Sequence, residues 1–149
     1  TGILSIFSTR ILHGKSIRVF EDGQESRDFV YIDDVVRATM LALFGPAAAG
    51  QVFGIGSGTP TSVLSAAHTL RRHFGKPADI SVTGEYRLGD IRHNYADLTK
   101  ARRLLGFAPE VDFDTGIARF VQWVLGHPVQ QDGYERSLQE MKEKGLMRG

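Results

Sequence analysis

Apolar residues recur at helical spacing from the opening of the chain onwards. One face of a predicted helix carries five of them: Ile3, Leu4, Phe7, Ile11 and Leu12. Gly14 follows at the point where this helix is expected to end. The same spacing predicts five further helices, over residues 34–44, 61–74, 97–106, 112–125 and 134–141.

Short β-prone runs separate these helices and predict strands over residues 17–20, 27–32, 52–55 and 80–82. Within the second, Phe29–Ile32 is continuously apolar, which is typical of a strand buried on both faces. Asp33 or Asp34 follows directly and is expected to cap the next helix. Short strands interspersed with about six helices indicate a mixed α/β fold.

The charge balance and the lack of cysteine limit which molecules this chain is expected to bind. The chain has 149 residues, the size of one domain, and 18 basic residues against 17 acidic ones leave a net charge of +1. This balance argues against nucleic acid or an anionic membrane as the partner. The absence of cysteine excludes disulfides and thiolate metal sites and fits a cytoplasmic protein. Because the chain opens on Thr1 rather than Met, we expect it to be part of a longer protein.

Two familiar site motifs fail on detail. Residues 54–59 read Gly-Ile-Gly-Ser-Gly-Thr after a predicted strand, but the third glycine of a dinucleotide fingerprint would stand where Thr59 does. Tight-turn glycines are the better explanation. Ser57 is one position late for the nucleophile elbow of a hydrolase. The five histidines never share metal-ligand spacing, so no metal site is predicted.

Residues 87–93, Arg-Leu-Gly-Asp-Ile-Arg-His, carry the strongest chemical signal. A guanidinium can donate two parallel hydrogen bonds to phosphate oxygens, and a carboxylate accepts from both hydroxyls of a ribose, so Arg87, Arg92 and Asp90 suit a nucleoside diphosphate. The alternative is a surface loop in which Asp90 pairs with Arg87 or Arg92. Arg27 also has two interpretations. It either solvates the edge of a strand, or it binds an oxyanion of a ligand from a rigid strand.

Four motifs in order now resemble one known family. They are R-D-F-V before D-D-V-V, then V-F-G-I-G-S-G, then R-L-G-D-I-R, then A-D-L-T-K-A-R-R-L-L-G-F-A-P, and they span about residues 2–125. Together they resemble the C-terminal half of extended short-chain dehydrogenases/reductases, the NAD-dependent nucleotide-sugar epimerases and dehydratases. The resemblance implies that residues 1–149 form the substrate-binding lobe, and that a Rossmann half binding NAD or NADP lies outside this chain.

The resemblance also implies roles for individual residues. Arg27 and Arg87 match arginines that contact the diphosphate, and Asp90 matches the carboxylate on the ribose. The backbone of the strand segment Val19 and Phe20 would contact the pyrimidine, while Ile3 and Leu4 would offer backbone N–H groups to the diphosphate. On this view Arg27, Arg87 and Asp90 share one cleft. Gly54 departs from the family, which usually has Asn there.

Catalysis is not expected of this chain by itself. No tyrosine has a lysine four positions on, so the Tyr-x-x-x-Lys pair of the family is missing. The resemblance implies a UDP- or dTDP-sugar 4-epimerase, in which NAD takes hydride from C4 of the sugar. A 4,6-dehydratase, a decarboxylase and a non-catalytic nucleotide-sugar-binding module remain open, as does a homodimer. Apolar surface is expected along the opening helix and residues 29–32, where the other half would pack.

Overall fold

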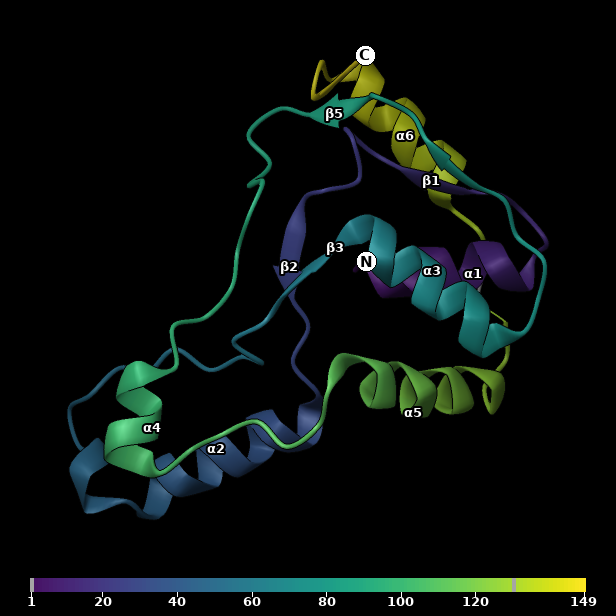
Figure 1. The fold of residues 1–149 in the computed structure, drawn as a ribbon. Coiled ribbons are helices and arrows are strands. Elements are labelled where there is room, and N and C mark those ends of the chain that lie inside the picture. Colours follow the sequence, from purple (N-terminus) through teal and green to yellow (C-terminus); the bar gives the residue numbers. More distant parts are fainter. Residues whose placement is uncertain (1, 130) are drawn as a thin grey trace. The chain divides into compact units, whose positions relative to one another are not determined.

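The structure is a computed structural model that describes residues 2–129 and 131–149. Its backbone divides into two compact units. Unit 1 is drawn from Thr1–Glu25, Ser62–Arg92 and Ile117–Gly149, and unit 2 from Ser26–Thr61 and His93–Gly116. The described residues form six α-helices and short strands, which confirms the predicted mixed α/β fold (Figure 1). None of these helices combines the length and apolar character needed to cross a bilayer.

Unit 1 is built on a pair of parallel strands covered by helices. The strands are β1 (Ile17–Val19) and β4 (Ile80–Val82), with Ile17 opposite Ile80 and Val19 opposite Val82. Helices α1 (Ile3–Leu12) and α3 (Val63–Phe74) lie side by side (Figure 1). Because side chains alternate along a strand, Ile17 and Val19 are fully buried while Arg18 between them is only partly buried.

The C-terminal residues complete unit 1. Helix α6 (Tyr134–Glu143) leads into β6 (Met147–Arg148), which pairs antiparallel with β5 (Tyr86–Arg87). Arg87 lies opposite Met147, and the Leu88 N–H donates to the Leu146 carbonyl at 2.9 Å. The end of the chain therefore fixes the segment that carries Arg87.

Arg10 joins the opening helix to α6 and is 4% exposed. Its Nη1 lies 2.9 Å from Glu135 Oε1, and its Nε donates to the Ser16 carbonyl at 2.5 Å. The guanidinium also lies 4.6 Å from the centre of the Tyr134 ring. A buried cation is tolerated when paired and hydrogen-bonded in this way, so Arg10 holds Tyr134 in a defined place.

Unit 2 contains β2 (Ser26–Asp28), α2 (Ile32–Phe44), a 3₁₀ turn (Pro46–Ala48), α4 (Thr99–Leu105) and most of β3 (Pro60–Ser62), with β2 beside β3. The last helix, α5 (Phe113–Leu125), begins in unit 2. An apolar cluster holds α2 to α4, and its fully or nearly buried members are Ala38, Leu98, Ala101 and Phe107.

Asp34 is the polar centre of unit 2 and is 2% exposed. Its carboxylate accepts the N–H groups of Glu110 at 3.0 Å and Val111 at 3.1 Å, and Nη2 of Arg37 at 2.8 Å. Burial alone would raise the pKa of Asp34, but these hydrogen bonds together with the positive charge of Arg37 bring it below its usual value. Asp34 therefore stays ionised and ties the 110–111 loop to α2.

Two predictions about residues 27–34 are wrong. The strand is Ser26–Asp28 and the helix begins at Ile32, so Phe29–Ile32 is not a strand, and Ile32 is 61% exposed rather than buried. The N-cap is Tyr31 without a side-chain cap, so neither Asp33 nor Asp34 caps the helix. The helix begins two residues before Asp34, and the Asp34 carboxylate instead accepts N–H groups from the distant 110–111 loop.

Other boundaries divide into confirmed and wrong predictions. Ser62 caps α3 by accepting the Ser65 N–H at 3.1 Å, as predicted. Residues 52–55 do not form a strand, because Phe53 and Ile55 pack against the apolar cluster of unit 2 without pairing. The opening helix buries Phe7 and Ile11 instead of exposing its apolar face.

Candidate functional site

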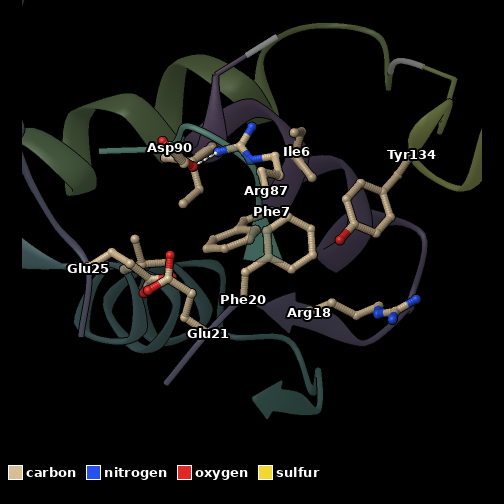
Figure 2. A pocket seen from close by; sticks show the side chains of 11 residues that line it. Ile6, Phe7, Arg18, Phe20, Glu21, Glu25, Arg87, Asp90 and Tyr134 are labelled. Carbon is tan, nitrogen blue, oxygen red and sulfur yellow. Dashed lines mark hydrogen bonds and ion pairs between the residues drawn. The ribbon is translucent and has the colours of Figure 1, made fainter. Parts of the chain in front are cut away.

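Unit 1 contains a cavity of about 100 Å³ between β1, α1 and α6 (Figure 2). This is roughly seven times the space that one water molecule needs by the same measure. Its apolar wall consists of Ile3, Ile6, Phe7, Phe20 and Val63. Its polar groups come from Arg18, Glu21, Glu25, Arg87, Asp90 and Tyr134. An apolar pocket with a few convergent polar groups is the usual form of a small-molecule site.

Arg87 and Asp90 lie together at this cavity. Arg87 Nη2 is 2.5 Å from Asp90 Oδ2, and the guanidinium lies 5.9 Å from the centre of the Phe20 ring (Figure 2). Gly89 has a φ of +76°, a left-handed conformation that glycine adopts without strain and that brings residues 87 and 90 together. Of the two pairings left open for Asp90, the structure shows the one with Arg87.

This ion pair can exchange partners. The Arg87 side chain is 47% exposed and that of Asp90 29%, so the pair is weakly held and open to solvent. A phosphate can take the guanidinium, because two parallel N–H donors match two phosphate oxygens. Asp90 Oδ2 would then accept from vicinal hydroxyls of a ribose. The geometry therefore accommodates both the self-paired loop and a ligand site.

Arg92 has a structural task beside the cavity. Its two terminal nitrogens lie 2.6 Å from Glu21 Oε2 and 2.6 Å from Asp22 Oδ2. Hydrogen bonding from Arg92 lowers the pKa of Asp22 below its usual value. Glu21 has a φ of +46°, which is uncommon outside glycine. Arg92 therefore holds a constrained turn that presents Glu21 to the cavity.

Two further polar residues of the cavity are almost completely buried. Glu25 is 6% exposed and Tyr134 is 9% exposed. Glu25 Oε2 and the Tyr134 hydroxyl have no hydrogen-bond partner among the described residues. Burial raises the pKa of Glu25, with smaller contributions from the charges of Glu21 and Asp22, and burial likewise raises the pKa of Tyr134. Both side chains are thereby favoured in their neutral forms.

The structure brings four of the predicted site residues to one cavity: Ile3, Phe20, Arg87 and Asp90. Val19 is fully buried, and its carbonyl accepts the Thr83 N–H at 2.9 Å. Leu4 is half-buried and its carbonyl accepts the Ser8 hydroxyl at 2.7 Å. Neither residue lines the cavity.

Arg27 belongs to unit 2, whereas the cavity belongs to unit 1. Its Nη1 donates to the Ser26 carbonyl at 2.9 Å, a local bond that orients the side chain at the start of the strand. A role for Arg27 on the same diphosphate as Arg87 stays a prediction.

The glycine loop of residues 54–58 does not fit a dinucleotide. Asp28 fills it: Oδ1 accepts both the N–H and the hydroxyl of Ser57 at 2.6 Å, and Oδ2 accepts the N–H of Gly58 at 3.1 Å. A Cβ on Gly56 would lie 2.2 Å from Asp28 Oδ2. The pyrophosphate of NAD would meet this carboxylate instead of free N–H groups, so the described residues supply no NAD cradle here.

Sequence reasoning missed several residues of the cavity. Arg18 could have been found from the alternation along its strand, since its neighbours Ile17 and Val19 are core residues. Glu25 and Tyr134 carry no sequence signal, because a carboxyl in a turn and a tyrosine at a helix start are ordinary surface features. Only the packing of α6 against α1 brings Tyr134 inward.

Comparison with known proteins shows which family this chain resembles. Residues 1–56 match the model of the NAD dependent epimerase/dehydratase family. The predicted resemblance to that family is confirmed. The chain is 39% identical over 124 residues to the dTDP-L-rhamnose 4-epimerase of Burkholderia thailandensis, a match that covers 83% of this chain. It spans only 34% of that epimerase, about a third of its length.

Solved structures of epimerases share the fold. The UDP-glucose 4-epimerase of Thermotoga maritima, determined with UDP-glucose, superposes with a TM-score of 0.74 at 35% identity, over 85% of this chain and 40% of that one. The UDP-glucuronic acid 4-epimerase of Bacillus cereus, in complex with UDP-glucuronic acid and NAD, gives 0.73 at 28% identity, over 83% and 40%. Both epimerase structures therefore contain this arrangement of helices and strands as part of a longer chain.

Proposed function

We propose that this chain belongs to an NAD-dependent nucleotide-sugar 4-epimerase and that unit 1 anchors the nucleoside diphosphate of a UDP- or dTDP-sugar. The observation that carries the proposal is the pair of Arg87 and Asp90 at the rim of an apolar cavity (Figure 2). The names of the similar proteins favour a 4-epimerase over a dehydratase or a decarboxylase.

The proposed role of this chain is to orient the nucleotide-sugar substrate. Arg87 would hold a phosphate, Asp90 the ribose hydroxyls, and Phe20 with Ile3 the face of the base. Charge-assisted hydrogen bonds contribute roughly 1.5–3 kcal/mol each, so a few of them give micromolar affinity. Holding the diphosphate fixes where the sugar lies, which converts binding energy into positioning for the reaction at C4.

NAD, when bound in the complete protein, would accept and return the hydride. Because the 54–58 loop is filled by Asp28, we propose that residues outside this chain hold the cofactor. The 149-residue chain alone is therefore expected to bind nucleotide sugars without turning them over. Arg27 remains a second candidate for the diphosphate.

The test uses the complete protein and Arg87→Ala, with Arg71→Ala as the matched control. Arg71 lies on α3, where it contacts the Ala78 carbonyl and His68, and it does not line the cavity. We expect Arg87→Ala to raise Kd and KM for UDP-glucose at least tenfold, and Arg71→Ala to leave both unchanged. Arg87→Lys should fall between them, because it keeps the charge but loses the fork.

Asp90→Ala gives an independent arm. Loss of the acceptor for the ribose hydroxyls is expected to weaken UDP-glucose binding about threefold to tenfold. Wild-type KM and kcat in both Arg87→Ala and Asp90→Ala would refute the assignment of the site.

A further inference from the structure

Two buried polar atoms in residues that line the cavity lack a hydrogen-bond partner among the described residues. Glu25 Oε2 and the Tyr134 hydroxyl are buried and have no partner among the described residues. Leaving such atoms unpaired costs free energy, so native proteins satisfy more than nine in ten of them. Both atoms belong to residues that line the same cavity. The simplest account is that a ligand supplies the missing partners.

The charges around Glu25 indicate which part of a nucleotide sugar would lie beside it. Glu21 and Asp22 lie near Glu25, and both are paired with Arg92. The negative charges of Glu21 and Asp22, partly compensated by Arg92, disfavour a diphosphate at that end, whereas Arg87 at the rim attracts it. The end of the ligand near Glu25 must therefore be uncharged.

The walls of the cavity favour a flat, largely apolar group. Figure 2 shows the rings of Phe7 and Phe20 below Arg87, with the Tyr134 hydroxyl on one side of them and the carboxyl groups of Glu21 and Glu25 on the other. Aromatic side chains stack on the faces of heterocycles. A nucleobase satisfies both requirements, since it is planar and has hydrogen-bonding atoms only at its edge.

We propose that Glu25 reads the hydrogen-bonding edge of the nucleobase and that the Tyr134 hydroxyl makes a second polar contact to the bound nucleoside. This inference rests on the proposed function and adds the base specificity of the site. Glu25 is held in place through its backbone, whose carbonyl accepts the Val63 N–H at 2.8 Å at the start of α3. Tyr134 is held by Arg10 stacked on its ring.

The protonation state of Glu25 selects the base. A neutral carboxyl group offers one O–H donor and one C=O acceptor, which match the C=O and N–H of the uracil or thymine imide. An ionised carboxylate offers acceptors only and would match the two N–H donors of the guanine edge. Burial, with Glu21 and Asp22 nearby, opposes ionisation more than Arg92 favours it. The site is therefore suited to uracil or thymine over guanine.

Titration calorimetry of the complete protein tests this with UDP-glucose and GDP-glucose. Both keep a constant charge on the diphosphate across the range studied. Wild-type protein at pH 6 should bind UDP-glucose at least tenfold more tightly than GDP-glucose. Glu25→Gln keeps one donor and one acceptor, so its affinity for UDP-glucose should stay within about twofold, while Glu25→Ala should lose about tenfold. Glu143→Gln, an exposed change of the same kind on α6, is the control.

The pH profile separates base reading from a structural role. As pH rises through the raised pKa of Glu25, the wild-type affinity for UDP-glucose should fall because Glu25 ionises, and Glu25→Gln should abolish that fall. Tyr134→Phe should weaken UDP-glucose binding about threefold to tenfold. The same variant should raise the Tm of the free protein, because it removes an unpaired buried hydroxyl.

The outcomes are distinguishable. Failure of the wild type to bind any nucleotide sugar would overturn the proposed function and this inference with it. Binding of UDP-glucose with equal affinity for GDP-glucose would overturn the inference alone. A pH profile unchanged by Glu25→Gln, or full affinity in Glu25→Ala, would do the same.

Discussion

The two units handle buried carboxyl groups in opposite ways. In unit 2, Asp28 and Asp34 are surrounded by N–H donors from distant loops, and hydrogen bonds outweigh burial to lower the pKa of each. In unit 1, Glu25 is buried like Asp34, whereas Asp28 is only partly buried, but one oxygen of Glu25 has no donor among the described residues and its pKa is raised. A buried carboxylate with its donors in place holds a fold together. A buried carboxyl group without such donors is suited to form a hydrogen bond with a bound ligand.

The largest effect expected from this contrast is on stability. Asp34→Ala would leave the N–H groups of Glu110 and Val111 and the Arg37 guanidinium without their acceptor, at a cost of about 3–5 kcal/mol. At a pH below the pKa of Glu25, Glu25→Gln should change the free energy of unfolding by no more than about 0.5 kcal/mol, because no protein donor to Oε2 is lost. Urea denaturation of both variants measures the difference, and equal losses would contradict it.

A smaller effect is expected where the chain closes around Asp28. A methyl group on Gly56 would lie 2.2 Å from Asp28 Oδ2, so Gly56→Ala must displace the loop and should cost about 2–3 kcal/mol. Gly133→Ala is the matched control, because no atom lies within 4 Å of its added Cβ and its φ is −88°. A similar Tm for the two variants would show that Asp28 does not constrain the loop.

The smallest effect is on the pH dependence of stability, where the units should differ in sign. The folded-state pKa values of Asp28 and Asp34 are lowered, so the stability they confer is present above their unfolded values and is lost as pH falls. The folded-state pKa of Glu25 is raised, so stability decreases as pH rises from about 4.5 through that pKa. Glu25→Gln should therefore gain stability relative to wild type with rising pH. A constant difference between the two from pH 4 to pH 7 would rule this out.

Much of the fold followed from apolar spacing and chain breakers. The helices around Ile11, Leu70 and Val121 were predicted because each buries one regular stripe. The run Phe29–Ile32 misled because its residues are β-prone, while the local geometry is set by Asp28 and Asp34. These two carboxylates bind loops about 30 and 76 residues further along the chain, which a local pattern cannot reveal.

Only some of the residues that line the cavity could be predicted from the sequence. Arg87 and Asp90 were predicted because their spacing allows a turn around Gly89 that brings both side chains to one place. Tyr134 could not be predicted, because its burial depends on contacts between the far end of the chain and its beginning, and Glu25 could not, because a carboxyl group in a turn is an ordinary surface feature. A buried polar side chain indicates a binding site only once the tertiary structure shows that it has no hydrogen-bond partner in the protein.

A crystal structure of the complete protein with UDP-glucose tests the central claim most directly. The account predicts that uracil lies in the unit 1 cavity against Phe20 and beside Glu25, with Arg87 on a phosphate and Asp90 on the ribose. UDP bound elsewhere, with Arg87 still paired to Asp90 and the cavity empty, would contradict it.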